Sequence, residues 1–253
     1  MKYIEELQKK KVFDLAFAEK LTGNLLSAKS LLSAYKKAGY IISVRRNLYA
    51  ALDLATKHTL ASRFEIGSAI NAGAYISFHS ALEYHGIANQ VFYSVTVCSE
   101  ERFTSFSYNG VTYEPCKAGI SGGVISPLQT PLVRVTDVER TVVDCIYDID
   151  RAGGLEELME SLRLLPGLDE EKLRTYLRSY NQIFLWQKAG FLLEHFRQAL
   201  RLSPAFFEEC KENIHDRKRY LPEAGAMRYY PEWKLYAPAN LLGLLEEGDD
   251  ANV

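Results

Sequence analysis

Two pairs of ionisable side chains have a spacing that could support chemistry. Glu83 follows His79 by four residues, and Asp144 follows Arg140 by four. Residues four apart lie on the same face of a helix, so each pair can bring an acid against a base. A carboxylate beside an imidazole can orient a general base, and His85 adds a second imidazole nearby. The alternative interpretation, which we favour, is that these groups form caps, packing contacts and ion pairs inside the domain.

A metal-dependent nuclease is a second enzymatic interpretation. Asp216, Glu232 and Lys234 contain the E-x-K core of such a pattern. The same E-x-K spacing also occurs at residues 170–172 and 209–211, so the signal is close to background.

Other sequence signatures of catalysis are weaker still. Gly67-Ser68 and Asp148-Ile149-Asp150 are too far apart in the chain for one strand–turn–helix unit to present a nucleotidyltransferase site. The sequence has no P-loop, dinucleotide-binding or nucleophile-elbow motif. His79 and His85 are poorly spaced for zinc, and the four cysteines form no C-x-x-C pair. We therefore expect no metal, no cofactor and no catalysis.

Charge is distributed unevenly along the chain. Residues 1–52 carry ten Lys or Arg and four Asp or Glu, a net charge of +6, whereas the remaining residues carry a net charge of −8. A basic segment joined to an acidic body is typical of a nucleic-acid-binding module attached to a domain with another task. No apolar run approaches the roughly 20 residues of a membrane helix, and acids near the start argue against a signal peptide. We expect a cytoplasmic protein with no membrane partner.

The basic segment has the pattern of a winged helix-turn-helix. Helical patterns at residues 4–11, 14–21 and 27–38 are followed by strand patterns at 40–44 and 48–52. Opposite the apolar stripe of the third helix lie small polar and basic residues, namely Lys29, Ser30, Ser33, Lys36 and Lys37.

Two features of this segment would face DNA. The third helix, which we expect Ser27 to cap, would place its hydroxyls and lysines in the major groove. The turn between the strands contains Arg45, Arg46 and Asn47, and it would form a wing along phosphates or in the minor groove. The alternatives are an ordinary helical bundle with solvated lysines and a winged helix that binds protein.

The middle of the chain predicts helices and strands in alternation. We expect a connecting helix over residues 53–72 and a short helix that Ser77 caps and Gly86 ends. Strands are expected at residues 92–98, 103–108, 111–115, 123–128 and 132–135. Asn109-Gly110 is a strong signal for a hairpin turn. A capping box from Thr136 to Glu139 should open a helix that ends near Tyr147.

The last third of the chain is mostly helical. Helices are expected over residues 155–164, 169–180, 183–202 and 204–214. These patterns together predict an α+β fold: an N-terminal winged helix-turn-helix over residues 1–52, a larger mixed α/β domain over 53–245 that becomes mostly helical toward the C-terminus, and an acidic flexible tail over 246–253.

Two stretches of the body resemble the AbiEi family of antitoxins and transcriptional regulators of abortive-infection operons. Residues 75–86 contain the run I-S-x-H-S-A-L-x-x-H-G, and residues 135–154 contain E-R-T-x-x-D followed by G-G. Residues 231–238 also resemble the end of the family's domain. The order and spacing of these stretches are more specific than any one motif.

The resemblance implies an antitoxin of a type IV toxin–antitoxin system. The winged helix would bind double-stranded DNA of its own promoter, typically at repeated sites, and repress it. The larger domain would neutralise a cognate nucleotidyltransferase-type toxin, generally without a tight, stable complex. The family-like runs contain the candidate residues for antitoxin function, which are His79, Glu83, His85, Arg140 and Asp144.

Two other functions remain open at this point. One is a DNA nuclease that the winged helix targets to its substrate, and the other is a transcriptional regulator with a ligand-sensing C-terminal domain. A second basic cluster, at residues 215–219, is either a solvated helix end or a contact to DNA or to an acidic partner.

Overall fold

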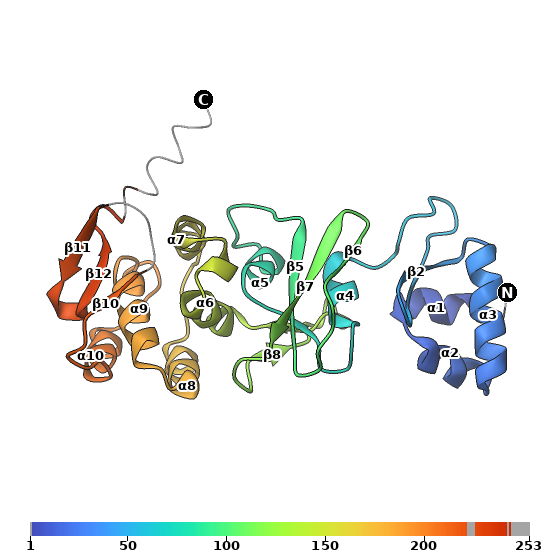
Figure 1. Ribbon diagram of the computed structural model, residues 1–253, viewed down its shortest axis with the longest axis horizontal. Helices are drawn as coiled ribbons and strands as arrows, with labels where there is room; N and C mark the ends of the chain where they lie inside the picture. The colour runs from blue at the N-terminus through green and yellow to red at the C-terminus, as the bar shows by residue number, and fades with distance from the viewer. Residues whose placement is uncertain (1, 222–225, 242, 244–253) are drawn as a thin grey trace, which may run out of the picture. The chain divides into compact units, whose positions relative to one another are not determined.

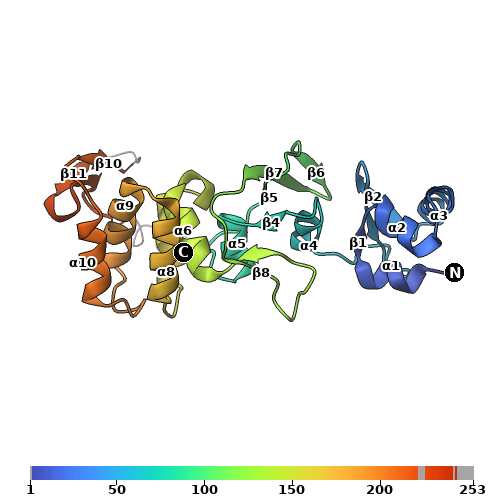
Figure 2. The same ribbon diagram turned by 90° about the horizontal axis from the view of Figure 1, so that it is seen from below.

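The computed structural model describes residues 2–221, 226–241 and 243, and the chain divides into two compact units (Figure 1, Figure 2). The first unit contains Met1–Ile76, Phe92–Ala118 and Val124–Val135. The second contains Ser77–Val91, Gly119–Gly123 and the chain from Thr136 onward. The N-terminal segment therefore shares a unit with the strands that follow it, whereas the sequence suggested a boundary after residue 52. The expected acidic tail over 246–253 lies outside the described residues.

The N-terminal segment forms a small module of helices and one sheet. Its elements are α1 (Ile4–Lys10), β1 (Val12–Phe13), α2 (Leu15–Thr22), α3 (Leu25–Lys37), β2 (Ile41–Arg45) and β3 (Leu48–Ala51). The strands are antiparallel in the order β1-β3-β2. Apolar side chains from all three helices and from the sheet form the module's buried core: Leu7, Phe13, Ala18, Ala28, Leu32, Ile41 and Ala51.

The start of α3 differs from the expectation that Ser27 caps it. The cap is Asn24, whose side-chain oxygen accepts a hydrogen bond from the Ser27 backbone N–H at 2.8 Å. Gly23 precedes it with a φ of 85°, a left-handed conformation that glycine adopts without strain. The earlier cap adds Leu25 and Leu26 to the helix, so its first turn carries two apolar side chains.

The hairpin between β2 and β3 is tighter than expected. Its turn contains Arg46 and Asn47, and Arg45 is the last residue of β2. Asn47 has a φ of 60°, and its side-chain oxygen accepts a hydrogen bond from the backbone N–H of Leu15 at 3.0 Å. The prediction that Arg45 lies in the turn is therefore wrong, because the two-residue turn leaves it in the strand.

A six-stranded mixed sheet lies in the first unit, in the order β6-β7-β5-β4-β9-β8. The strands are β4 (Tyr75–Ile76), β5 (Ser94–Ser99), β6 (Phe106–Tyr108), β7 (Val111–Lys117), β8 (Val124–Ile125) and β9 (Val135–Thr136). β5 and β7 are parallel, and β6 and β7 form an antiparallel hairpin. Asn109 and Gly110 both have positive φ at its turn, which confirms the predicted hairpin.

The expected connecting helix over residues 53–72 is largely wrong. Only α4 (Arg63–Ser68) is helical there, and Ser62 opens it through a capping box with Glu65. The upstream residues instead turn around Asp53, whose carboxylate accepts hydrogen bonds from the backbone N–H groups of Ala55 and Thr56. A side chain that bonds its own backbone in this way competes with helix formation.

The second unit is mainly helical, as the sequence predicted. Its helices are α5 (His79–Tyr84), α6 (Val138–Tyr147), α7 (Leu155–Arg163), α8 (Glu170–Tyr180), α9 (Ile183–Glu194) and α10 (Pro204–Glu212), with a 3-10 turn, η1, at Asp150–Ala152. The N-caps of α5 and α6 each lie one residue later in the chain than expected. Asp137, not Thr136, caps α6, and Phe78, not Ser77, precedes α5 with a φ of 54° and no side-chain cap bond.

The chain after His215 forms a small sheet that the sequence did not predict. Its elements are β10 (Arg219–Tyr220), β11 (Met227–Tyr230), η2 (Pro231–Trp233) and β12 (Leu235–Pro238), with strand order β10-β12-β11. Trp233 packs directly against Gly190 of α9, where a Cβ atom would overlap its ring, and its indole N–H bonds Glu194 at 2.8 Å. The described chain thus has an α+β fold, and none of its helices is long and apolar enough to cross a membrane.

Candidate functional site

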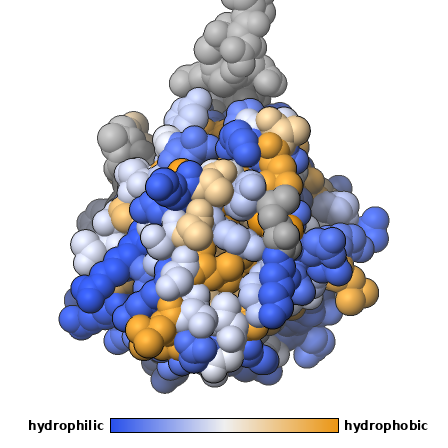
Figure 3. All heavy atoms as spheres, turned by 90° about the vertical axis from the view of Figure 1, so that its right-hand side faces the viewer, coloured by the Kyte–Doolittle hydropathy of each residue, from blue (hydrophilic) through white to orange (hydrophobic). Residues whose placement is uncertain are grey.

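The polar face of α3 carries the basic and small polar residues that the sequence predicted for it. Every one of its five expected members is exposed: Lys29, Ser30, Ser33, Lys36 and Lys37. Ala28 and Leu32, on the opposite side of the helix, are buried in the module's core. Figure 3 views the molecule from the side on which α3 lies in Figure 1, and hydrophilic side chains cover much of that face. The structure therefore places these five residues together at the surface.

The three expected wing residues have different environments. Arg46 is exposed at the turn. The guanidinium of Arg45 instead lies over the rings of Phe106, at 4.9 Å, and Phe103, at 5.7 Å. Its Nη1 atom is buried without a hydrogen-bond partner among the described residues. Asn47 is exposed, but its side-chain oxygen is engaged with the start of α2. Arg46 alone keeps a free cationic group at the hairpin tip.

His79 lies in the interior of the second unit between two carboxylates. Its Nδ1 is 3.1 Å from Oε1 of Glu83, and its Nε2 is 3.1 Å from Oε1 of Glu157. The same Glu157 oxygen also accepts the backbone N–H groups of Asn89 and Gln90. Burial by itself lowers the pKa of His79, but the hydrogen bonds and charges of the two carboxylates outweigh it and raise that pKa overall.

Arg140 is the second buried charge of this unit. It is 1% exposed, and its Nε donates to Oδ1 of Asp144 at 2.6 Å. Its Nη1 donates to the backbone carbonyls of Ile120 and Gly122 at 3.1 and 2.6 Å. Burial raises the pKa of the Asp144 carboxyl, while the Arg140 guanidinium and two hydroxyl donors act in the opposite direction. The guanidinium is thus paired and hydrogen-bonded, as a buried charge must be.

Hydroxyl groups from distant segments complete this network. Ser77 donates to Oδ2 of Asp144 at 2.7 Å, and Tyr180 of α8 donates to Oδ1 at 2.5 Å. Tyr176 of α8 donates to the Asp137 carboxylate, which also caps α6 by accepting the N–H of Arg140. The network therefore joins α6, α8 and the strand-to-helix turn before α5.

The candidate antitoxin residues are accordingly parts of the interior. The side chains of His79, Glu83, Arg140 and Asp144 are at most 3% exposed. His85 is half-buried, with Nε2 2.7 Å from the Thr136 carbonyl, and burial lowers its pKa. The four buried side chains hold helices in place and are almost fully shielded from solvent. Sequence reasoning missed Glu157, because an acid in an amphipathic helix gives no signal that it faces inward.

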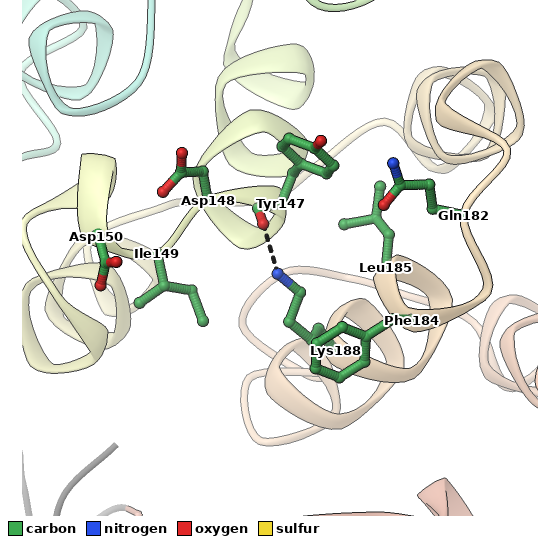
Figure 4. Close-up of a pocket in the computed structure, with 8 residues that line it drawn as sticks. All are labelled: Tyr147, Asp148, Ile149, Asp150, Gln182, Phe184, Leu185 and Lys188. Carbon is green, nitrogen blue, oxygen red and sulfur yellow. Dashed lines mark hydrogen bonds between the residues drawn. The ribbon is translucent and has the colours of Figure 1, made fainter. Parts of the chain in front are cut away.

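A cavity of about 360 Å³ lies between the end of α6 and α9 in the same unit (Figure 4). Lys188 lines it, is 6% exposed, and donates from Nζ to the Tyr147 carbonyl at 2.6 Å. A cation near the carbonyl end of a helix is stabilising. Burial lowers the pKa of Lys188 to about 8, and the nearby Asp148 and Asp150 carboxylates oppose that shift. Sequence reasoning did not single out this lysine, because the long apolar pattern of its helix hides it.

The residues of the nuclease pattern do not gather into a metal site. Asp216 and Lys234 form an ion pair at 2.5 Å, and Glu232 is exposed. Across the part of the chain that the structure describes, no group of three or more His, Cys, Asp or Glu side chains could hold a metal ion. In the basic cluster at 215–219, Lys218 lies over the Tyr229 ring and Arg219 over the Phe184 ring.

Comparison with known proteins gives a likeness of fold. No family model matches the chain, and no curated protein matches it. The crystal structure of the RV2827C protein from Mycobacterium tuberculosis is similar, with a TM-score of 0.63 and 15% sequence identity. The match covers 98% of this chain and 94% of that chain. At this identity the likeness establishes the fold alone, and it extends along nearly the whole chain.

Replacing His79 by Gln should destabilise the protein in a pH-dependent way. A histidine whose pKa is raised on folding stabilises the native state fully below its unfolded pKa of about 6.5, and this contribution is lost as the pH rises through the folded value. The difference in unfolding free energy between wild type and H79Q should therefore be largest near pH 5.5 and shrink toward pH 9, as measured by urea titration. The exposed His58→Gln is the control and should show little difference at either pH. A gap that widens with pH would contradict this account.

Replacing Asp144 by Ala should be severely destabilising. The substitution leaves the Arg140 guanidinium buried without its carboxylate, which costs about 3–5 kcal/mol. Glu208→Ala is the matched control, because its side chain is 67% exposed and its ion pair with Lys211 at the surface of α10 is worth about 0–1 kcal/mol. Urea midpoints of the two variants compare the costs directly. Equal losses would show that the buried network is not a main source of stability.

Proposed function

We propose that this protein is a DNA-binding repressor of its own operon and the antitoxin of a type IV toxin–antitoxin system. The observation that carries the DNA-binding half is the face of α3, where lysines and serines are exposed together. The antitoxin half rests on the resemblance of residues 75–86 and 135–154 to the AbiEi family.

The order of elements in the N-terminal module supports a winged helix-turn-helix. Helices α2 and α3 are joined by a short turn at Gly23 and Asn24, and the β2–β3 hairpin follows α3. In such a module the second helix of the pair enters the major groove. Here that helix is α3, and Arg46 at the hairpin tip acts as the wing contact to phosphates.

The distribution of charge favours the same arrangement. The net charge of +6 over residues 1–52 contrasts with the net −8 of the remaining chain, so DNA is attracted to the module and repelled from much of the body. Lysines at 29, 36 and 37 can reach phosphates while Ser30 and Ser33 allow the helix to approach base edges closely.

The antitoxin activity belongs to the surface of the second unit in this proposal. His79, Glu83, Arg140 and Asp144 act as positioning residues, since their buried contacts hold α5, α6 and, through Glu157, α7. A toxin would meet the exposed residues that these helices present.

A ligand-sensing regulator is the second candidate function. The cavity beside Lys188 favours it, because the buried ammonium lines this space beside the Tyr147 and Phe184 rings, and the Tyr147 carbonyl accepts one of its three donors. A small molecule that changed operator affinity in the wild type and not in Lys188→Met would support this candidate.

Replacing Lys29 and Lys36 by Ala should weaken binding to the DNA directly upstream of the gene. Each phosphate-contacting lysine contributes about 0.9 to the slope of log K against log salt, so the double variant should lose nearly two units. Fluorescence anisotropy over a salt series measures the slope. As a control, Lys211→Ala removes one lysine charge from α10 and should leave the slope unchanged. Equal slopes for wild type and the double variant would remove α3 from the interface.

The antitoxin half has a separate test. The gene next to this one is expressed from an inducible promoter, with and without this chain, and growth is followed. Wild type should restore growth, and the Lys29/Lys36 double variant should restore it equally while losing repression of the promoter, because the two activities use different surfaces. Failure of the wild type to restore growth would reject the antitoxin assignment and leave the DNA-binding assignment standing.

A further inference from the structure

The first turn of α3 exposes large apolar side chains. Within the described residues of the N-terminal module, the exposed large hydrophobic residues are Leu25, at 40%, and Leu26, at 78%. Both residues belong to α3 because Asn24, not Ser27, is its N-cap. In Figure 3, the hydrophobic residues on this side of the molecule form several separate patches that lie among hydrophilic residues.

Leu26 lies on the same helical face as the polar residues that the DNA-binding proposal uses. Lys29 and Ser30 follow it by three and four residues, and Ser33 follows it by seven. This spacing brings the four side chains onto one stripe of the helix. The core residues Ala28 and Leu32 lie on the opposite stripe, so Leu26 has no place in the module's interior.

The residues around Leu26 indicate which kind of partner binds this face of α3. An apolar protein partner would require a wide apolar patch, whereas Lys29, Lys36 and Lys37 make this face strongly basic. Duplex DNA satisfies both features, because phosphates flank a major groove that also contains apolar groups. The apolar group on base edges is the C5 methyl of thymine, and alkyl side chains are suited to contact it. The N-terminal residues of a recognition helix are those that reach base edges.

We infer that Leu26 contacts a thymine methyl group in the major groove and so helps to set the sequence preference of α3. This inference rests on the proposed DNA-binding function. It assigns the lysines to affinity and Leu26 to specificity, because phosphates carry no sequence information and thymine methyls do.

Deoxyuridine tests the inference, since it differs from thymidine only by that methyl group. The full chain first selects its preferred duplexes from a random-sequence pool, and each thymine of the selected site is then replaced by deoxyuridine. One replacement should weaken binding of the wild type about fourfold, the factor for one buried methyl group. Leu26→Ala should bind the thymine duplex less tightly and should not discriminate between the two duplexes.

Leu128→Ala is the matched control, because Leu128 is 92% exposed and lies outside the N-terminal module. It should retain the fourfold preference for thymine. A change below twofold at every thymine, a selected site without thymine, or a preference that persists in Leu26→Ala would overturn the inference while leaving DNA binding intact. A pool that shows no enrichment and no selective binding would reject the proposed function itself, together with this inference.

Discussion

The second unit is organised around the buried charge of Arg140. A guanidinium in the interior is tolerated only when its charge is paired and its donors are satisfied. Asp144 supplies the charge, and the carbonyls of Ile120 and Gly122 accept further hydrogen bonds. Ser77 and Tyr180 then bond to the same carboxylate. One ion pair thereby fixes the positions of α6, α8, the 119–123 loop and the segment before α5.

The acid–base pairs that first suggested chemistry are both buried in this unit. The spacing of His79 with Glu83, and of Arg140 with Asp144, does bring acids against bases, but deep in the unit. Low exposure and close pairing with opposite charges are properties of groups that specify a structure, whereas a catalytic group must reach its substrate. In the proposed antitoxin function, a toxin would therefore meet the exposed surfaces of this unit rather than these buried groups.

The interior of the N-terminal module differs from that of the second unit. Its core is apolar, and the charges of α3 all remain in water. The exposed face of α3 carries its lysines, its serines and Leu26, and this is the surface that the proposed DNA contact uses. Arg45 is the exception, because its guanidinium packs on the rings of Phe103 and Phe106 and contributes to the structure.

The sequence by itself determined the features that depend on local pattern. Asn109-Gly110 gave the hairpin, the helices of the last third followed their apolar periodicity, and the polar stripe of α3 is exposed as expected. Only the tertiary structure decided that Glu157 faces His79, that Arg45 packs on the Phe106 ring, and that residues 53–62 do not form a helix. Each of these outcomes depends on contacts between distant segments or on a side chain that competes with the backbone, and neither leaves a periodic signal in the chain.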